Sequence, residues 1–316
     1  MKSFAFVFPG QGSQSVGMMD AWDNHPVVAS TLAEASDALH QDIGLLISQG
    51  TKETLALTTN TQPVMLVAGV AAYRVWMAET GCLPAAVAGH SLGEYSALVA
   101  AGVLSLGDAA PLVRFRAKAM QQALPVGSGA MAAIMGMDAD RVVAGCTEAM
   151  EYFGNDSVEV VEAVNFNDPM QTVVAGSKLA VDKACEILKA NGAKRALLLA
   201  VSAPFHSSLM RPAAEQLRQK LSEVTFSPPQ IPLINNIDIA VEMDADRIRD
   251  ALYRQAFGPV RWVECVSAIK ARGVFNIIEC GPGKVLAGLV KRIDVDLIGA
   301  PLFDPASTAA VKELLA

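Results

Sequence analysis

The chain has 316 residues, about twice the length of an average domain, so two structural units are expected. Its 32 acidic residues outnumber its 25 basic ones, and the net charge of −7 argues against nucleic acid as the main partner. A composition that is 52% hydrophobic and 18% charged excludes disorder as the main state. No apolar stretch reaches the roughly 20 residues of a membrane span.

The N-terminal apolar run, residues 4–8, ends at Pro9-Gly10. It is too short for the core of a signal peptide and predicts a buried strand instead. The five cysteines are scattered, and no pair has the spacing of metal ligands or of a disulfide framework. These features favour a reduced cytoplasmic location, and they signal neither a metal nor a redox cofactor.

Short β-type runs alternate with segments of helical periodicity, which predicts an α/β protein with a mainly parallel sheet. In the first part of the chain we expect strands at residues 4–8 and 85–88. We also expect a buried helix at 63–79 with a proline near its start, and a helix at 92–101 that Gly102 closes.

The pattern changes after Gly127-Ser128-Gly129, a linker signal. The next segment predicts the order β-α-β-β-α-β, which is the ferredoxin-like motif. Its elements are expected at residues 130–135, 138–153, 158–164, 172–175, 177–191 and 195–201. We therefore predict a small domain of residues 128–202 inserted into a core of residues 1–127 and 203–316.

The α/β pattern then resumes with strands expected at residues 232–235 and 274–278. The sequence Gly281-Pro282-Gly283-Lys284 lacks the spacing of a phosphate-binding loop and predicts a turn before a helix at 285–291.

The sharpest local signal is Gly89-His90-Ser91-Leu92-Gly93, a G-x-S-x-G sequence between a predicted strand and a predicted helix. In that position a strained turn lifts the serine hydroxyl clear of the sheet, as in an α/β-hydrolase-like core. Ser91 is therefore the candidate nucleophile, and the backbone N–H of Leu92 is a candidate oxyanion donor. A turn with an incidental serine is the alternative.

A serine nucleophile needs a base, and the chain has four histidines. His25 and His40 fall in a loop and at the polar end of a helix pattern, where solvated positions are expected. His90 is expected to brace the turn, because neighbours at an elbow point apart. His206 directly follows the last predicted strand of the small domain and is the leading base for Ser91; a polar residue that opens a helix is the alternative.

The order Ser, then Asp or Glu, then His of ordinary hydrolases is not evident here. Acidic residues between Ser91 and His206 fall mostly in helix or loop patterns. A Ser–His dyad oriented by a group other than a carboxylate is therefore expected, which weakens the case for a plain esterase.

A glycine-rich loop, Gly10-x-Gly12, follows the first strand. Ser15 occupies the position of the third glycine in a dinucleotide-binding fingerprint, so that fingerprint is broken. The loop is better interpreted as a second source of backbone oxyanion donors.

A basic run, Arg114 to Lys118, lies on a helix expected to start near Asp108, because Pro111 fits poorly inside a helix. Arg114 and Arg116 are two residues apart and so face different sides. Such charges usually form a solvated face, but one of them could clamp a substrate carboxylate through paired hydrogen bonds.

Seven motifs occur in order along the chain, and together they resemble the malonyl-CoA:acyl carrier protein transacylase family of fatty-acid synthesis. They are Phe8-Pro9-Gly10-Gln11-Gly12-Ser13-Gln14, Gly89-His90-Ser91-Leu92-Gly93, Arg116-x-Lys118-x-Met120-Gln121, Asn165-Phe166-Asn167, Phe205-His206, Asn235 and Gly281-Pro282-Gly283-Lys284-Val285-Leu286. The resemblance covers nearly the whole chain and agrees with an inserted ferredoxin-like domain.

This resemblance implies a role for each matched residue. Ser91 would carry the malonyl group as an ester, His206 would be its general base and acid, and Arg116 would pair with the malonyl carboxylate. The remaining implied roles are an oxyanion hole from the backbone N–H groups of Gln11 and Leu92, a backbone carbonyl of Gln255 that orients His206, and substrate contacts from His90 and Asn165.

The expected partners are malonyl-CoA and an acyl carrier protein, served by ping-pong kinetics. No cofactor, nucleic acid or membrane is expected, and the chain is expected to be a monomer. Lys284, Lys291 and Arg292 are candidate carrier contacts or merely solvated charges. Three other functions stay open: an acyltransferase of polyketide synthesis or malonate decarboxylation, a serine thioesterase or esterase, and a non-catalytic docking subunit.

Overall fold

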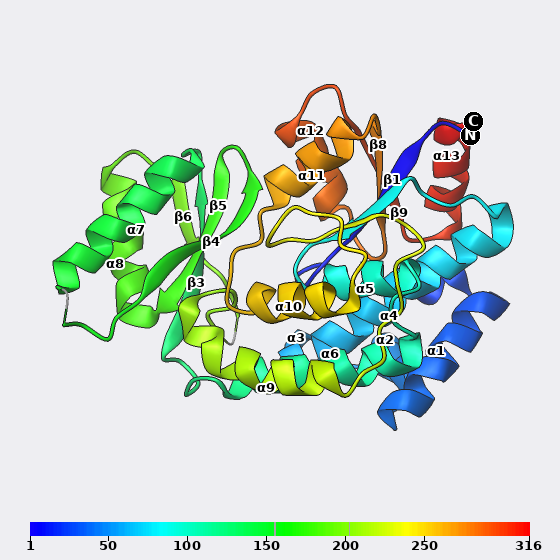
Figure 1. Ribbon diagram of the computed structural model, residues 1–316, viewed down its shortest axis with the longest axis horizontal. Coiled ribbons are helices and arrows are strands. Elements are labelled where there is room, and N and C mark those ends of the chain that lie inside the picture. The colour runs from blue at the N-terminus through cyan, green and yellow to red at the C-terminus, as the bar shows by residue number, and fades with distance from the viewer. Residues whose placement is uncertain (155, 202) are drawn as a thin grey trace.

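The computed structural model describes residues 1–154, 156–201 and 203–316, which form a larger unit around a parallel sheet and a smaller unit around an antiparallel sheet (Figure 1). This confirms the predicted α/β class. The larger sheet has the strand order β7-β2-β1-β8-β9, and every neighbouring pair in it is parallel. Its strands are β1 (Phe4–Phe8), β2 (Ala86–Gly89), β7 (Leu233–Ile234), β8 (Asn276–Cys280) and β9 (Ile298–Leu302).

Helices cover both faces of the parallel sheet (Figure 1). They are α1 (Pro26–Leu39), α2 (Ile43–Gln49), α3 (Lys52–Ala56), α4 (Thr58–Thr80), α5 (Gly93–Ala100), α6 (Leu106–Gln122), α9 (Arg211–Ser222), α10 (Ala245–Gln255), α11 (Trp262–Ala271), α12 (Val285–Ile293) and α13 (Pro305–Leu315). Two 3-10 helices, η1 (Asp20–Trp22) and η2 (Ser208–Met210), lie between them.

The central strand β1 shows why this sheet needs helices on both sides. Side chains alternate along a strand, so Phe6 and Phe8 point to one face and Ala5 and Val7 to the other. Phe6 meets Trp76 of α4 with ring centroids 5.7 Å apart, whereas Ala5 and Val7 pack in a second core with α11 and α12. An unbroken apolar run is therefore buried on both faces, as parallel strands usually are.

The smaller unit contains a four-stranded antiparallel sheet with the order β4-β5-β3-β6. Its two helices pack on one face around a separate apolar core, and the other face turns toward the larger unit (Figure 1). The elements are β3 (Gly129–Met135), α7 (Ala139–Phe153), β4 (Val161–Asp168), β5 (Gln171–Ser177), α8 (Lys178–Ala190) and β6 (Arg195–Leu198). Residue 202, the expected end of the small domain, lies outside the described residues.

Two helices begin earlier than predicted. The prediction placed a proline near the start of each helix, whereas in the structure the proline lies inside it. The helix expected from residue 63 starts at Thr58, and the one expected near Asp108 starts at Leu106 with Ser105 as its N-cap. Pro63 and Pro111 are each the sixth helical residue, where proline costs one backbone hydrogen bond. Tertiary packing offsets that cost, since both helices lie deep in the larger core.

The second strand of the small unit is shifted relative to its predicted range of 158–164. It runs from Val161 to Asp168, because Asn165 and Phe166 still pair with β5 across register shifts. Near its end, the polar residues Asn165 and Asn167 line a cavity.

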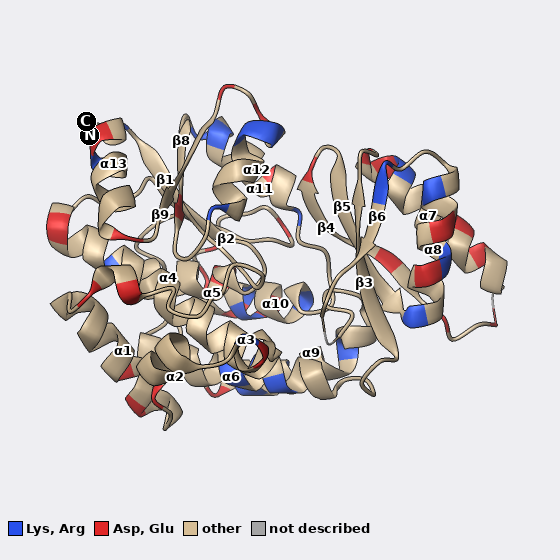
Figure 2. Ribbon diagram, turned by 180° about the vertical axis from the view of Figure 1, so that it is seen from behind, with Lys and Arg blue, Asp and Glu red and all other residues tan. Residues whose placement is uncertain are grey.

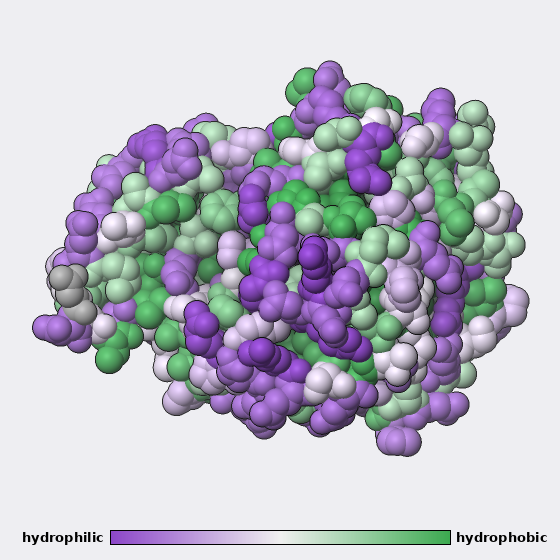
Figure 3. Space-filling view, viewed as in Figure 1, coloured by the Kyte–Doolittle hydropathy of each residue, from purple (hydrophilic) through white to green (hydrophobic). Residues whose placement is uncertain are grey.

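The outer surface is polar where helices face water. Hydrophilic residues cover α9 and α10 in the space-filling view, and both helices bury only one apolar stripe (Figure 3). Within the described ranges, no helix combines the length and apolar character that crossing a bilayer would require.

Candidate active site

Ser91 sits on a sharp turn between β2 and α5, held in a left-handed conformation with φ of 52°. Two glycines make that turn possible. A Cβ on Gly89 would lie 1.9 Å from the Gly93 carbonyl carbon, and one on Gly93 would lie 2.0 Å from the carbonyl oxygen of Phe8. Only glycine fits at these close backbone approaches, and the strained turn exposes the serine at the carboxyl end of the sheet.

His206 lies directly against Ser91. Its Nε2 is 2.6 Å from Ser91 Oγ, and its Nδ1 is 2.8 Å from the backbone carbonyl of Gln255. A carbonyl can only accept, so Nδ1 carries the proton and Nε2 is free to accept the serine proton. Burial, and then the nearby Arg116 charge, lowers the pKa of His206 to about 3. The imidazole is therefore neutral and ready to act as a base at physiological pH.

Arg116 brings a positive charge to the same place. It is 2% exposed; its Nη1 donates to Gln62 Oε1 at 2.6 Å, and its Nη2 lies 3.4 Å from Ser91 Oγ. Its Nε has no hydrogen-bond partner among the described residues. Arg114, two residues earlier, faces elsewhere and donates to Gln41. A buried guanidinium with donors to spare is suited to receive a carboxylate.

A cavity of about 120 Å³ contains the reactive groups, and it shares much of its lining with an adjoining cavity of about 460 Å³. The smaller one is lined by Gln11, His90, Ser91, Arg116, Met131, Asn165, Leu199, Val201, Phe205 and His206. The larger one runs between the Pro9–Gln14 loop, the open face of the small sheet and α12. A small acyl group fits the first space, and a longer arm fits the second.

Two backbone donors are available beside the nucleophile. Among the described residues, the N–H groups of Gln11 and Leu92 have no backbone or side-chain acceptor. Leu92 also precedes the N-terminus of α5, whose dipole favours negative charge. The Gln11 side chain accepts from Thr58, which anchors the loop.

His90 and Asn165 line both cavities but differ in their contacts. His90 Nε2 is 2.8 Å from Asn167 Oδ1, and its ring packs on Trp262, so it braces the turn. Asn165 Oδ1 is buried without a partner within the part of the chain that the structure describes. Asn165 is thus the one of the two with an unused polar atom beside the cavities.

Comparisons with known proteins show the family of this chain. Residues 5–292 match the model of the acyl transferase domain family. The chain belongs to this acyl transferase family. It is 51% identical to the malonyl CoA-acyl carrier protein transacylase of Escherichia coli strain K12, over 99% of this chain and 100% of that one. The Bacillus subtilis protein of the same name is 43% identical over 96% of this chain and 95% of its own.

Solved structures of the acyl transferase family superpose on the whole chain. The acyl-carrier-protein S-malonyltransferase of Burkholderia pseudomallei is 61% identical, with a TM-score of 0.95 and coverage of 99% of this chain and 100% of that one. A malonyl-transacylase solved in complex with a type II PKS acyl-carrier protein is 48% identical, with a TM-score of 0.95 and the same coverage.

Asn236 was not predicted from the sequence, yet in this acyl transferase it stabilises the turn between β2 and α5 that carries Ser91. Its Oδ1 accepts from the Ser91 N–H at 2.8 Å, and its Nδ2 donates to the Gly89 carbonyl at 2.8 Å. The seven motifs include its neighbour Asn235, whose Oδ1 instead accepts from the Asp238 N–H. The sequence shows a pair of asparagines at the end of a strand, but it does not indicate which of the two side chains bonds to the Ser91 turn.

Two further polar residues of the site were missed, Gln62 and Glu94. Both are buried, Gln62 in α4 after the polar run of residues 58–61 and Glu94 in the first turn of α5. Gln62 supports Arg116, and the Glu94 carboxylate lies under the turn. Glu94 carried a signal, as the one charged residue in the mostly apolar helix α5, whereas Gln62 did not stand out after the polar run of residues 58–61.

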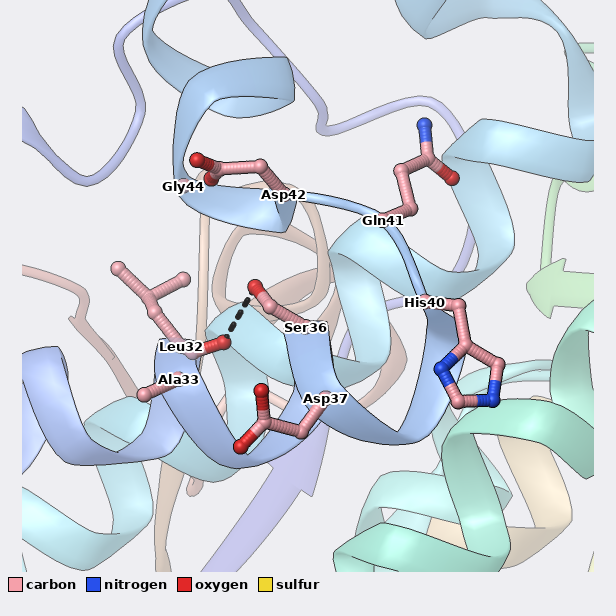
Figure 4. Close-up of a pocket in the computed structure, with 8 residues that line it drawn as sticks. All are labelled: Leu32, Ala33, Ser36, Asp37, His40, Gln41, Asp42 and Gly44. Carbon is pink, nitrogen blue, oxygen red and sulfur yellow. Dashed lines mark hydrogen bonds between the residues drawn. The ribbon is translucent and has the colours of Figure 1, made fainter.

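Other surface features lie apart from this site. A wider hollow of about 720 Å³ lies between α1 and α2, and none of its lining residues lines the Ser91 cavity (Figure 4). Its Ser36 hydroxyl is used internally, donating to the Leu32 carbonyl (Figure 4). The described residues contain no group of His, Cys, Asp or Glu arranged to hold a metal ion.

Two basic residues, Lys291 and Arg292, lie in the last turn of α12 (Figure 2). Arg292 lines that cavity, and its Nε lies 3.1 Å from Asp168 Oδ2 of the small unit. Lys284 and Lys291 are exposed. Lys291 and Arg292, at the end of α12 that borders the larger cavity, are called the basic rim below.

Proposed function

We propose that this chain transfers the malonyl group of malonyl-CoA to the thiol of an acyl carrier protein, through a malonyl ester of Ser91. The observation that carries this proposal is the buried Arg116 guanidinium 3.4 Å from Ser91 Oγ, because an esterase for neutral substrates has no use for such a charge. The acyl transferase family and the activity in its relatives' names support the same reaction.

In the first half-reaction, Ser91 Oγ attacks the malonyl thioester while His206 Nε2 takes the hydroxyl proton. The N–H groups of Gln11 and Leu92 stabilise the oxyanion that forms. The C–S bond then breaks, and His206 returns its proton to the departing CoA sulfur. The Gln255 carbonyl holds the imidazole in one tautomer throughout.

In the second half-reaction, the carrier's pantetheine thiol gives its proton to His206 Nε2 and attacks the Ser91 ester. The ester C–O bond breaks, and Ser91 recovers its hydroxyl proton from His206. Because CoA leaves before the carrier reacts, the kinetics are ping-pong. Arg116 fixes the malonyl carboxylate, which keeps the ester carbonyl out of line with water and so favours transfer over hydrolysis.

The finer assignments belong to the same proposal. His90 and Asn165 contact the substrate from the walls of the cavities that they line. The strand orders support a ferredoxin-like unit of residues 128–202 inserted into an α/β-hydrolase-like core of residues 1–127 and 203–316. The chain works as a cytoplasmic monomer without a cofactor. A carrier protein of polyketide synthesis is the second candidate acceptor, because a 48% identical relative was solved with one.

Intact-protein mass spectrometry after mixing with malonyl-CoA tests the proposal. A malonyl adduct on the wild type, absent from Ser91→Ala and discharged by added carrier protein, is the expected result. Free CoA accumulating without carrier and without an adduct would indicate a hydrolase instead. Neither adduct nor CoA release would indicate a non-catalytic role.

A further inference from the structure

We propose that Glu94 is a positioning residue of the acyl transfer, whose carboxylate holds Asn236 and Gln255 and through them sets Ser91 against His206. This inference rests on the proposed function, in which Ser91 and His206 react. Among the described residues, the Glu94 carboxylate makes no hydrogen bond to Ser91 Oγ or to His206, so it acts through its neighbours.

One carboxylate oxygen joins the two supports of the site. Glu94 Oε2 accepts from the Asn236 backbone N–H at 2.9 Å and from Gln255 Nε2 at 3.0 Å. Asn236 in turn fixes the Ser91 N–H, and Gln255 Nε2 also donates to the Ser91 carbonyl at 3.0 Å. Glu94 therefore ties down the turn that carries the nucleophile.

The same oxygen acts on the base. The Gln255 backbone carbonyl accepts from His206 Nδ1, while the Gln255 side chain bridges Glu94 and Arg116 Nη2. A displacement of Gln255 would therefore turn the imidazole and release the guanidinium together. Glu94 is 2% exposed, so water cannot replace these bonds.

The charge on Glu94 matters because both of its partners are donors. An ionised acceptor makes hydrogen bonds about twice as strong as a neutral one. The charged and titratable groups that face it are Arg116 from α6, Asp238 from the loop after β7, Cys265 from α11 and Tyr95 from its own helix. Arg116 is the only cation among these four, and it favours the ionised carboxylate.

Titration of Glu94 gives the proposal a specific signature. Burial raises the pKa of Glu94 to about 7, whereas the pKa of His206 is about 3. As pH falls through about 7, Glu94 takes up a proton and its grip on Asn236 and Gln255 weakens. The acylation rate should fall there, in a range where His206 stays neutral.

The test is a rapid-quench measurement of Ser91 malonylation across pH, read by intact mass at a saturating concentration of malonyl N-acetylcysteamine thioester. This probe lacks the phosphates of CoA, which titrate near pH 6. We expect Glu94→Gln to acylate more slowly than wild type by a factor on the order of 10 to 10². The fall near pH 7 should vanish in this variant.

A matched control is Glu279→Gln. Glu279 is another buried carboxylate with a pKa raised to about 7, but it binds the Ala287 N–H at the start of α12. This variant should keep the fall near pH 7. A Glu94→Gln rate equal to wild type, or a Glu94→Gln profile that keeps the fall, would overturn the proposal.

Two further outcomes distinguish a folding defect of Glu94→Gln from a failure of the proposed function. If Glu94→Gln does not fold, the wild-type profile decides: a fall near pH 7 supports the proposal, and a flat rate from about pH 5 to about pH 9 overturns it. If the wild type forms no Ser91 adduct at any pH, the proposed function itself fails, and this inference fails with it.

Discussion

The Nε2 atom of His206 lies 2.6 Å from Ser91 Oγ, although 115 residues separate the two along the chain. The whole small unit, from β3 to β6, lies between them in sequence. The chain leaves the larger unit after α6, folds a second sheet, and returns with the base at the point where β2 ends. The reactive pair therefore exists only when both units are folded.

Removing this base should nearly stop acyl transfer. We expect His206→Ala to slow Ser91 malonylation by a factor of about 10² to 10⁴, because a positioned base contributes that much. In the wild type, burial holds the pKa of His206 near 3, so its imidazole should stay neutral well below pH 6. NMR titration of the ring checks this; an imidazole that titrates near pH 6.5 would contradict the buried, neutral base.

Arg116 should set the choice of acyl group. Arg116→Ala should lower the preference for malonyl-CoA over acetyl-CoA by a factor on the order of 10 to 10², since it removes charged hydrogen bonds to the malonyl carboxylate. Arg116→Lys should also be impaired, because an ammonium does not reproduce the guanidinium fork. Competition between the two thioesters, followed by intact mass, measures the ratio.

Arg114→Ala is the matched control for that experiment. Arg114 lies on the same helix but donates to Gln41 instead of facing Ser91. This variant should keep the wild-type preference. Equal selectivity in Arg116→Ala and Arg114→Ala would rule out the carboxylate clamp.

Glu279 should make the fold less stable as pH rises. Its folded-state pKa of about 7 lies above the ordinary 4.5, so the unfolded chain ionises first and stability falls between about pH 4.5 and pH 7. A shift of this size corresponds to about 3 kcal/mol. Relative to wild type, Glu279→Gln should therefore gain unfolding free energy as pH rises from 4 to 8. Urea melts at several pH values measure the difference, and a difference independent of pH would contradict it.

The basic rim of α12 should govern the second half-reaction. Lys291→Glu should raise the KM for carrier protein, most clearly at low salt, while Ser91 malonylation by a phosphate-free thioester stays unchanged. Lys183→Glu, on α8 of the small unit, changes the charge equally at a distant helix and should leave that KM as it was. Equal KM values for both variants would place carrier docking elsewhere.

Most of the fold could be predicted from local pattern, because its strands and helices bury regular apolar faces. Strand β1 and the elbow around Ser91 follow from five apolar residues and two glycines. The early starts of α4 and α6 could not be predicted, since Pro63 and Pro111 are tolerated only because of tertiary packing. Residues Glu94 and Asn236 were missed for a related reason: the hydrogen bond between them spans 142 residues, which no local period records.

The position of β1 has a consequence for how the protein is made. This strand lies in the middle of the parallel sheet, yet its partner β8 is translated roughly 270 residues later. At elongation rates of roughly 5 to 20 residues per second, that delay is on the order of 10 to 50 s. Throughout that interval Phe4–Phe8 offers an unpaired, wholly apolar edge. Ribosome-bound chains should therefore depend on chaperones that bind this strand. Slow translation of the last third of the chain should increase aggregation of the newly synthesised protein.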